Sequence, residues 1–333
     1  MKILIIGAGA IGGSLACYLH SENLDITILE KNPEVRDAIN RDGVVLRDGE
    51  SVKVAKVKAV GTLGEEKYDC CFSATRAYHL KDAVLSVLPN LTEDAPVISM
   101  NNGVCIEPLL EAVGEQRAVW CAINYGAGIE GLGKYFIKIH GDVVMGTLRG
   151  ITHDLIRLKD ELQGDLEFNL TDNVVGALYS KMLINSCITS TAVVSGLTLG
   201  EILGRRSGKK IFLEILREGV RVAKRAGIKI PNYRGMNYYV FTAKNSFSAL
   251  YRAIVFPVLK KKYGQRTSAT LDAMKKGVKS EIDYFNGYVV SLGKKHGEQT
   301  VYNQALVDCV KSVEENFELI SADRLIELAS VRK

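Results

Sequence analysis

The first hundred residues alternate between short continuous apolar runs and longer segments of helical character. Residues 2–6 form a short, continuous apolar run that ends in glycine, which is typical of a strand buried in a parallel sheet. A second strand is expected at residues 25–29, and further buried strands at residues 70–73 and 97–100. Helices are expected between them, at residues 10–20, 32–40 and 78–88. This alternation predicts a mainly parallel sheet with right-handed crossovers, which is a Rossmann-type α/β domain.

Two further segments of the first half have the pattern of antiparallel strands. Residues 44–46 and 52–54 alternate in polarity around Asp48-Gly49, which predicts a hairpin. Residues 118–146 contain strand-like runs separated by glycine, and we expect an antiparallel extension of the sheet there. Residues 150–171 would hold the last helix of this domain and the linker.

The second half of the chain is dominated by helical periodicity. The expected helices cover residues 174–192, 209–226, 270–295 and 303–317. The pattern therefore predicts two domains. Residues 1–170 would form a dinucleotide-binding Rossmann domain, and residues 171–333 an all-α domain for substrate binding and catalysis.

Composition narrows the class of protein. Hydrophobic residues make up 47% of the chain and charged residues 24%, the balance of a globular protein. The net charge of +5 mildly favours anionic ligands and does not argue for nucleic acid. The lysine clusters at 209–210 and 260–262 are read as solvated helix faces.

The cysteines and the lengths of the apolar runs bear on the cellular compartment of the protein. The seven cysteines have no metal-binding spacing, and they are expected to be reduced, buried thiols of a cytoplasmic protein. The chain opens directly on a strand with no charged leader, and no apolar run reaches the ~18 residues of a membrane span. We therefore expect no metal, no membrane and no nucleic acid partner.

The segment Gly7-Ala8-Gly9-Ala10-Ile11-Gly12 has the pattern G-x-G-x-x-G, directly after the first strand and at the start of a helix. In this context Gly7 permits the tight turn, Gly9 lets a pyrophosphate approach the backbone, and Gly12 lets the helix pack closely. The first helical turn, with Ala10 and Ile11, supplies N–H groups for the phosphates. The alternative is a purely structural glycine turn.

An acidic residue that binds the ribose hydroxyls is expected about 20 residues after the glycines. Glu30 occupies that place, and its carboxylate would repel a 2′-phosphate, which favours NADH. Lys31 follows at once and would pair with a 2′-phosphate, or else it is a solvated loop lysine. These residues leave the choice between NADH and NADPH open.

One helical segment carries a polar stripe on an apolar background. Lys181, Asn185 and Thr189 are spaced by four residues and share one helix face, while their neighbours are apolar. Ketone reduction by hydride transfer needs an acid for the developing alkoxide, and a lysine whose pKa is lowered by burial can supply it. A substrate pocket would give the stripe its polar partners. The alternative is a solvent-facing stripe.

Other polar residues lie near the C-terminus and at strand ends. Ser268 or Thr270 would cap a following helix, and Glu281 either orients the lysine and binds a substrate hydroxyl or lies on the surface. Arg76 and Asn102 follow the third and fourth parallel strands, whose carboxyl ends carry the ligands in open α/β sheets. Arg76 would hold a carboxylate or phosphate, and Asn102 the nicotinamide amide or ribose, unless both are ordinary turn residues.

Together these residues resemble the ketopantoate reductase (2-dehydropantoate 2-reductase) family. The resemblance covers nearly the whole chain. It rests on ILIIGAGAIGG at 3–13, NNG at 101–103, the K-x-x-x-N of Lys181 and Asn185, and SEIDYFNGY at 280–288. It implies a Rossmann domain followed by a helical domain, with the active site in the cleft between them. It also implies reduction of ketopantoate to pantoate with NADPH, on the way to pantothenate and coenzyme A.

The resemblance also implies roles for single residues. Lys181 corresponds to the general acid, and Asn185 and Glu281 correspond to residues that contact the substrate. Ser268 matches a serine that binds the substrate carboxylate, and Asn102 matches an asparagine that touches cofactor and substrate.

This chain departs from the family pattern at several of these positions. The family usually has lysine where Arg76 stands and often has a second asparagine where Thr189 stands, and the spacer before Glu281 is one residue longer. Glu30 is unusual for an NADPH enzyme, whereas Lys31 falls where an arginine commonly binds the 2′-phosphate.

Three functions are therefore weighed. The leading hypothesis is a reductase of a 2-oxo acid, with ketopantoate first. The second keeps the fold and takes another branched 2-oxo acid or an imine. The third is a non-catalytic dinucleotide sensor, which has no need of an acid at Lys181. Whether the chain is a homodimer stays open.

Overall fold

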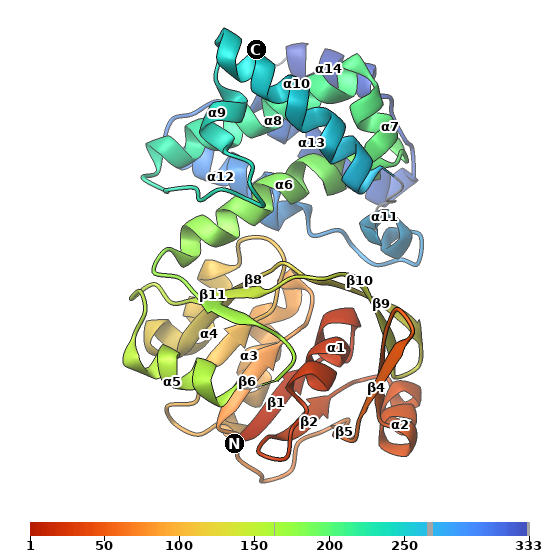
Figure 1. Cartoon of the computed structure of the whole chain (residues 1–333), viewed down its shortest axis with the longest axis vertical. Coiled ribbons are helices and arrows are strands. Elements are labelled where there is room, and N and C mark those ends of the chain that lie inside the picture. The colour runs from red at the N-terminus through yellow and green to blue at the C-terminus, as the bar shows by residue number, and fades with distance from the viewer. Residues whose placement is uncertain (163, 265–268, 332–333) are drawn as a thin grey trace. The chain divides into compact units, whose positions relative to one another are not determined.

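The computed structural model describes residues 1–162, 164–264 and 269–331, and it divides into two compact units, Met1–Val174 and Val175–Lys333 (Figure 1). None of the helices in the described ranges combines the length and the apolar character that crossing a membrane requires.

The first unit is built on a sheet of eight strands among its described residues. From one edge to the other the order is β12-β11-β8-β7-β6-β1-β2-β5. In chain order these strands are β1 (Lys2–Ile6), β2 (Asp25–Leu29), β5 (Lys58–Val60), β6 (Cys70–Ser73), β7 (Val97–Ser99), β8 (Ala118–Ile123), β11 (Val143–Gly146) and β12 (Phe168–Leu170). Every neighbouring pair is parallel except β8 and β11. The unit is thus the predicted Rossmann-type α/β domain.

Helices connect the parallel strands. They are α1 (Ala10–Leu19), α2 (Pro33–Asp42), α3 (Leu80–Val87), α4 (Ile106–Arg117) and α5 (His153–Glu161), with short 3-10 turns η1 (Ala77–His79) and η2 (Leu88–Asn90). The central strands are apolar at nearly every position because helices or strands cover both faces, and Ile3, Leu4 and Ile5 are completely buried. Trp120, the only tryptophan of the chain, is buried in β8 and donates its Nε1–H to the Cys105 carbonyl oxygen at 3.0 Å.

The prediction for residues 118–146 was only partly correct. The β8–β11 pair extends the main sheet antiparallel, as expected. The intervening strands β9 (Gly126–Gly131) and β10 (Lys134–Ile139) instead join the predicted hairpin, β3 (Val44–Asp48) and β4 (Ser51–Ala55), in a second sheet of order β4-β3-β10-β9. Here β10 runs parallel to β3, which lies far away in sequence. Helix α1 contacts both β1 and this second sheet (Figure 1).

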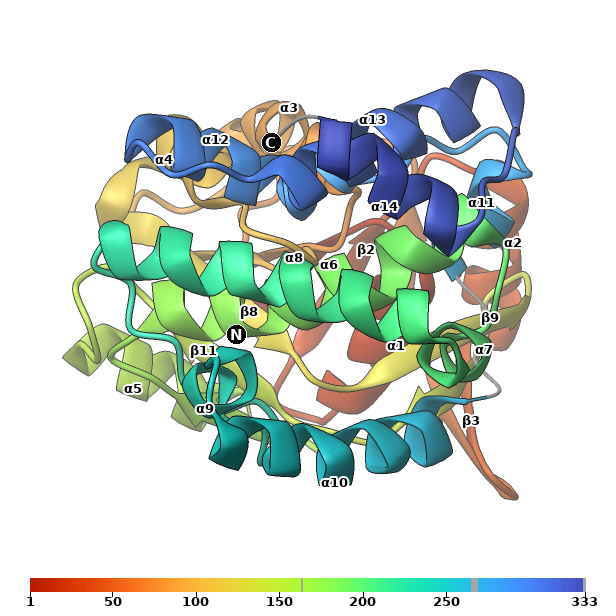
Figure 2. The same cartoon turned by 90° about the horizontal axis from the view of Figure 1, so that it is seen from above.

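The second unit is all-α in its described residues. The helices are α6 (Val174–Ser195), α7 (Leu199–Gly204), α8 (Arg206–Arg225), α9 (Tyr238–Thr242), α10 (Ser246–Tyr263), α11 (Ala269–Met274), α12 (Asn286–Lys295), α13 (Val301–Asn316) and α14 (Ala322–Val331), with the 3-10 turn η3 (Ile282–Tyr284). Figure 2 shows α8 running along α6, where Tyr179 Oη donates to the Gly219 carbonyl oxygen at 2.9 Å.

The single helix predicted over residues 270–295 is wrong. Helix α11 ends at Met274 because Gly277 adopts φ +78°, and the Gly277 and Val278 N–H groups close the last turn on Met274 and Ala273 carbonyls. The chain then passes through η3 before α12 begins at Asn286. Glu281 therefore lies on a connection between helices.

Candidate functional site

The glycine-rich turn follows β1 directly. Gly7 has φ +93°, which only glycine adopts readily, and a Cβ at Gly12 would collide with the Gly7 carbonyl oxygen. A Cβ at Gly9 would meet no heavy atom within 4 Å, so this backbone is open to an approaching group. Helix α1 begins at Ala10, and Ala10 and Ile11 are half-buried. The turn therefore fits a dinucleotide pyrophosphate at the N-terminus of α1.

The turn is supported from the second sheet, which the sequence did not indicate. A side chain at Gly13 would collide with the Tyr135 ring, and Tyr135 Oη donates to the Ala8 carbonyl oxygen at 2.6 Å. Burial raises the pKa of the Tyr135 hydroxyl, so Tyr135 stays protonated and keeps this donor role. The fourth glycine of the run, Gly13, is the one feature of the sequence that could have indicated this close contact with Tyr135.

Glu30 lies at the end of β2, beside the turn. Its Oε2 accepts from the Ala8 N–H at 2.7 Å and its Oε1 accepts from the Asn32 N–H at 2.8 Å. A carboxylate oxygen has two lone pairs, so each oxygen keeps capacity for a ribose hydroxyl. The predicted ribose ligand is thus also a structural element of the turn.

Positive charge stands next to Glu30. Lys31 is exposed, and Arg36 on α2 donates from Nη1 to the carbonyl oxygens of Glu30 and Lys31, at 3.0 and 2.8 Å. The position of a Cβ on Gly61 would be 2.9 Å from the Arg36 guanidinium carbon, so this guanidinium lies where β5 ends. Arg36 was not singled out from the sequence, because a helix arginine is normally a surface residue.

The turns after β6 and β7 lie close to the glycine-rich turn. Ala74 approaches both Gly7 and Gly12, with its carbonyl oxygen 3.4 Å from the position of a Gly7 Cβ. Asn101 is buried and joins the two turns, accepting from Ser99 Oγ at 2.8 Å and donating to the Thr75 carbonyl oxygen at 2.7 Å.

The two predicted strand-end residues belong to these turns. Arg76 is half-buried and directly precedes η1, and Asn102 is half-buried directly after Asn101. Both therefore stand at the carboxyl edge of the sheet, where open α/β sheets bind ligands.

The polar stripe of the second unit lies on α6. Lys181, Asn185 and Thr189 are all half-buried, whereas the residues between them are mostly buried, Met182, Leu183 and Cys187 completely so. The stripe is therefore a partly accessible face of an otherwise buried helix. A fully solvated stripe, the alternative to a substrate-binding face, would be more exposed than these half-buried residues are.

Thr189 and Glu281 line the same small pocket within the helical unit. Its other lining residues include Ser190, Thr270 and Ser280. Ser280 fixes the connection that carries Glu281, since its N–H donates to Glu314 Oε1 at 2.6 Å and its Oγ accepts from the Ile282 N–H at 3.3 Å. Ser268, the predicted carboxylate-binding serine, lies outside the described residues.

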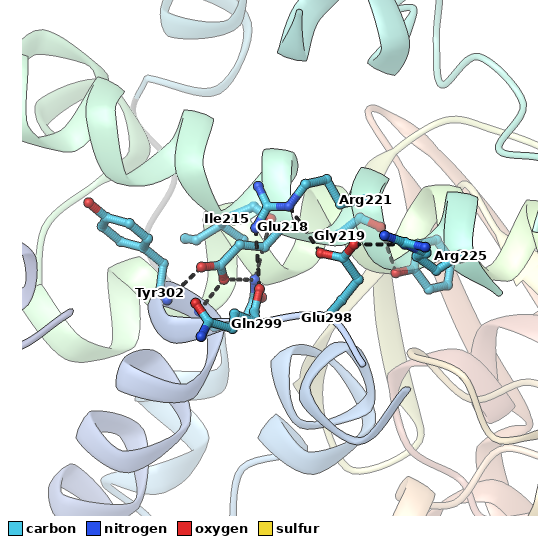
Figure 3. Close-up of polar contacts among 10 residues, drawn as sticks. Ile215, Glu218, Gly219, Arg221, Arg225, Glu298, Gln299 and Tyr302 are labelled. Carbon is cyan, nitrogen blue, oxygen red and sulfur yellow. Dashed lines mark hydrogen bonds and ion pairs between the residues drawn. The ribbon is translucent and has the colours of Figure 1, made fainter. Parts of the chain in front are cut away.

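A buried network of hydrogen-bonded polar side chains begins at Ser190 of this pocket. Ser190 Oγ donates to Asn286 Oδ1 at 2.5 Å, Asn286 Nδ2 donates to Asn303 Oδ1 at 2.9 Å, and Asn303 Nδ2 donates to Glu218 Oε2 at 2.8 Å. Glu218 also accepts the N–H groups of Tyr302 and Asn303 at the start of α13 (Figure 3). This buried polar network thereby connects α6, α12, α13 and α8.

This buried polar network could hardly be predicted from the sequence. Asn286 lies in the SEIDYFNGY segment, but Glu218 and Asn303 stand in ordinary helical patterns. They meet only because the fold brings together residues 85 positions apart.

Most of the cysteine thiols lie in the protein interior. The seven cysteines are outside disulfides and six are buried, and burial raises the pKa of Cys17 to about 11 and of Cys71 to about 12. Such thiols stay protonated and are poor nucleophiles at neutral pH. Across the described ranges, no three His, Cys, Asp or Glu side chains are grouped so as to hold a metal ion.

A glycine-rich turn at the carboxyl edge of a Rossmann sheet, with an acidic residue at the end of β2, is typical of a dinucleotide-binding oxidoreductase. Residues 3–150 match the family described as "Ketopantoate reductase PanE/ApbA", and residues 173–314 match "Ketopantoate reductase PanE/ApbA C terminal". The chain therefore belongs to the ketopantoate reductase family. It is an oxidoreductase that acts on a CH–OH group with a nicotinamide dinucleotide cofactor.

Relatives along the whole chain agree with this assignment. A 2-dehydropantoate 2-reductase of Pyrococcus abyssi is 26% identical over 321 residues, covering 94% of this chain and 98% of the relative. The corresponding protein of Pyrococcus horikoshii is 24% identical over 316 residues, with the same coverage.

Solved structures share the fold. A PanE/ApbA family ketopantoate reductase from Ralstonia eutropha has a TM-score of 0.78 at 21% identity, covering 95% of this chain and 99% of that chain. A D-mandelate dehydrogenase with NADH and anilino(oxo)acetate has a TM-score of 0.78 at 21% identity, covering 96% and 100%.

Proposed function

We propose that this chain reduces a 2-oxo acid to the 2-hydroxy acid, with ketopantoate as the first candidate substrate and pantoate as its product. The observation that carries the proposal is the partly accessible row of Lys181, Asn185 and Thr189 on a helix that is otherwise buried. Glu281 lines the same small pocket as Thr189, so the carboxylate lies beside one end of this row.

The bound nicotinamide supplies the hydride, and the protein supplies the proton and the binding groups. Lys181 is the general acid that protonates the alkoxide oxygen as charge develops there. Asn185 and Glu281 bind and orient the substrate, and Glu281 also accepts a hydrogen bond from a hydroxyl group. Thr189, Asn102 and Ser268 complete the polar contacts.

The nucleotide is held by the first unit. The backbone from Gly7 to Gly12 and the first turn of α1, with Gly9, Ala10 and Ile11, bind the pyrophosphate. Glu30 binds the adenosine ribose and disfavours a 2′-phosphate, so we expect NADH to be used better than NADPH. Lys31 and Arg36 partly offset that preference, and Arg76 holds an anionic group of cofactor or substrate.

A second substrate class stays under consideration because Thr189 lines the pocket where the family often has asparagine. A threonine offers one hydroxyl and a methyl group in place of an amide, which suits a different branched 2-oxo acid or an imine. Initial rates with NADH and NADPH against a panel of 2-oxo acids and imines, followed by nicotinamide absorbance, decide between these classes. The absence of turnover with every 2-oxo acid would overturn the proposed substrate class.

A further inference from the structure

Tyr135 on β10 reaches from the second sheet to the glycine-rich turn. Its side chain is 1% exposed, and its Oη donates to the Ala8 carbonyl oxygen at 2.6 Å. The two residues are 127 positions apart in the chain. The bond therefore ties the turn after β1 to a strand that is not part of the main sheet.

The strand that carries Tyr135 is held on both sides, by β3 and by β9. Tyr135 lies opposite Leu46 of β3, and both side chains are buried where the second sheet contacts α1. The pairing of β10 with β9 shifts register between Lys134 and Tyr135. Such irregularities re-aim a side chain and are common next to functional sites.

A glycine in α1 makes the space for the ring. A Cβ at Gly13 would collide with three atoms of the Tyr135 ring. Any other residue at position 13 would therefore displace the phenol from the Ala8 carbonyl. The hydrogen bond exists because a side chain is missing at one position and a tyrosine stands at another.

This hydrogen bond fixes the direction of one backbone N–H group. The Ala8–Gly9 peptide is trans, so the Ala8 carbonyl and the Gly9 N–H lie in one plane and point in opposite directions. Because Tyr135 holds the carbonyl on the buried side, the Gly9 N–H is directed away from the phenol. Position 9 is half-buried and open, since a Cβ there would meet no heavy atom within 4 Å.

Glu30 holds the preceding peptide group, because its Oε2 accepts from the Ala8 N–H at 2.7 Å. The two peptide groups that meet at Ala8 are thus each held by a side chain, one from the end of β2 and one from β10. A backbone held in this way need not reorganise when an anion binds, and such preorganisation increases affinity.

We propose that Tyr135 is a positioning residue for the cofactor, whose hydrogen bond to Ala8 presents the Gly9 N–H to the dinucleotide pyrophosphate. The inference rests on the pyrophosphate site proposed above. Tyr135 acts through the backbone of the turn, so its loss should weaken cofactor binding and leave the chemical step unchanged. A tyrosine with a purely structural role would affect the stability of the fold and not the affinity for one part of the cofactor.

Tyr135→Phe is the first test, because it keeps the ring beside Gly13 and removes only the hydroxyl. The dissociation constant of NADH, measured by nicotinamide fluorescence without substrate, should rise about tenfold. At saturating NADH, kcat and the KM for the 2-oxo acid should stay within about twofold of wild type, since only cofactor binding is lost.

ADP and adenosine, each competing with bound NADH, locate the effect on the cofactor. ADP carries the diphosphate, so its dissociation constant should rise in Tyr135→Phe by the same factor as that of NADH. Adenosine has the ribose and no phosphate, so wild type and variant should bind it alike.

Tyr179→Phe is the matched control in the helical unit. Tyr179 is completely buried, and its Oη also donates to a backbone carbonyl, that of Gly219 at 2.9 Å. Loss of this hydroxyl should lower the melting temperature much as Tyr135→Phe does, because each leaves a buried carbonyl without its donor. The dissociation constant of NADH should stay within about twofold of wild type, since this bond lies outside the glycine-rich turn.

Gly13→Ala tests the dependence on the ring. In wild type the added Cβ displaces Tyr135, and NADH should bind about tenfold more weakly. In a Tyr135→Ala background there is no ring to displace, and the same substitution should change the dissociation constant less than about twofold.

Three results would each overturn the proposal. They are wild-type NADH affinity in Tyr135→Phe, an equal loss of affinity for adenosine and ADP, and the same cost of Gly13→Ala in both backgrounds. A wild-type chain that binds no NADH would be a different failure, because it would remove the dinucleotide site itself and this inference with it.

Discussion

Glu30 Oε2 accepts a hydrogen bond from the Ala8 N–H at 2.7 Å, and this bond joins the end of β2 to the glycine-rich turn after β1. The carboxylate expected at the ribose is therefore also part of the frame that shapes the phosphate-binding backbone. Alanine at this position would remove both the charge and the bond. Glutamine removes the charge and keeps one acceptor oxygen, so it is the cleaner substitution.

Glu30→Gln should raise the ratio of kcat/KM for NADPH to that for NADH about tenfold, since ~1.4 kcal/mol of repulsion at the 2′-phosphate is removed. Steady-state rates at saturating 2-oxo acid measure this ratio. Glu34→Gln is the matched control. Glu34 is exposed on the first turn of α2, and its substitution removes the same charge. An unchanged ratio in the Glu30 variant would show that Glu30 does not meet the ribose.

Lys181→Ala should lower kcat at least ~10²-fold and leave cofactor affinity unchanged, because a general acid acts on the reacting oxygen only. Turnover and the dissociation constant of the cofactor are measured on the same preparation. Lys224→Ala, in the last turn of α8, provides a comparison in which an exposed lysine is lost. Near-normal turnover without the Lys181 amine would remove this residue from the mechanism.

Arg76→Ala should raise the KM for substrate or cofactor about tenfold, in keeping with the 1.5–3 kcal/mol of a hydrogen bond to a charged group. The prediction rests on its half-buried position just after the carboxyl end of β6. An Arg76→Lys variant that turns over ketopantoate faster than wild type would mark arginine as a specificity residue. If both variants have wild-type kinetics, Arg76 is a turn residue without a ligand.

Glu218→Gln should lower the free energy of unfolding by about 1–3 kcal/mol at pH 5, because one of the α13 N–H groups loses its acceptor. Burial raises the pKa of Glu218 despite the N–H donors around it. A carboxyl with a raised folded pKa contributes most below its unfolded pKa of about 4.3 and loses that contribution as pH rises through the folded value. The difference between wild type and variant should therefore shrink from pH 5 to pH 8.

Denaturant unfolding at both pH values measures this trend, and Glu298 provides the opposite case. Hydrogen bonds from Arg225 and Arg221 lower the pKa of Glu298, so its stabilisation is present above the unfolded pKa and is lost only as pH falls. The cost of Glu298→Gln should thus be constant between pH 5 and pH 8. A cost of Glu218→Gln that grows with pH would contradict the buried-carboxyl account.

The sequence predicted the nucleotide-binding half well because its signals are local. Strands β1 and β2 were expected with the bounds observed, and the glycine turn lies between strand and helix as its pattern requires. The stripe on α6 was likewise found from four-residue spacing within one helix.

The errors concern contacts between distant segments and one broken helix. Strand β10 pairs with β3 of a hairpin about 90 positions earlier, and β9 pairs with β10, an arrangement that periodicity does not encode. Residues 270–295 keep helical apolar spacing although Gly277 stops the helix, because spacing alone does not report a positive φ. The contacts of Glu30 and of Arg36 also arise from tertiary packing.

The buried Trp120 makes the two units spectroscopically distinct. This indole is the only one in the chain, and it is enclosed in β8 of the Rossmann unit. Its fluorescence therefore follows the melting of that unit alone, whereas far-UV ellipticity is dominated by the helices that follow. Coincident transitions by the two probes would mean that both halves unfold as one cooperative body, and separate transitions would assign each melting step to its half.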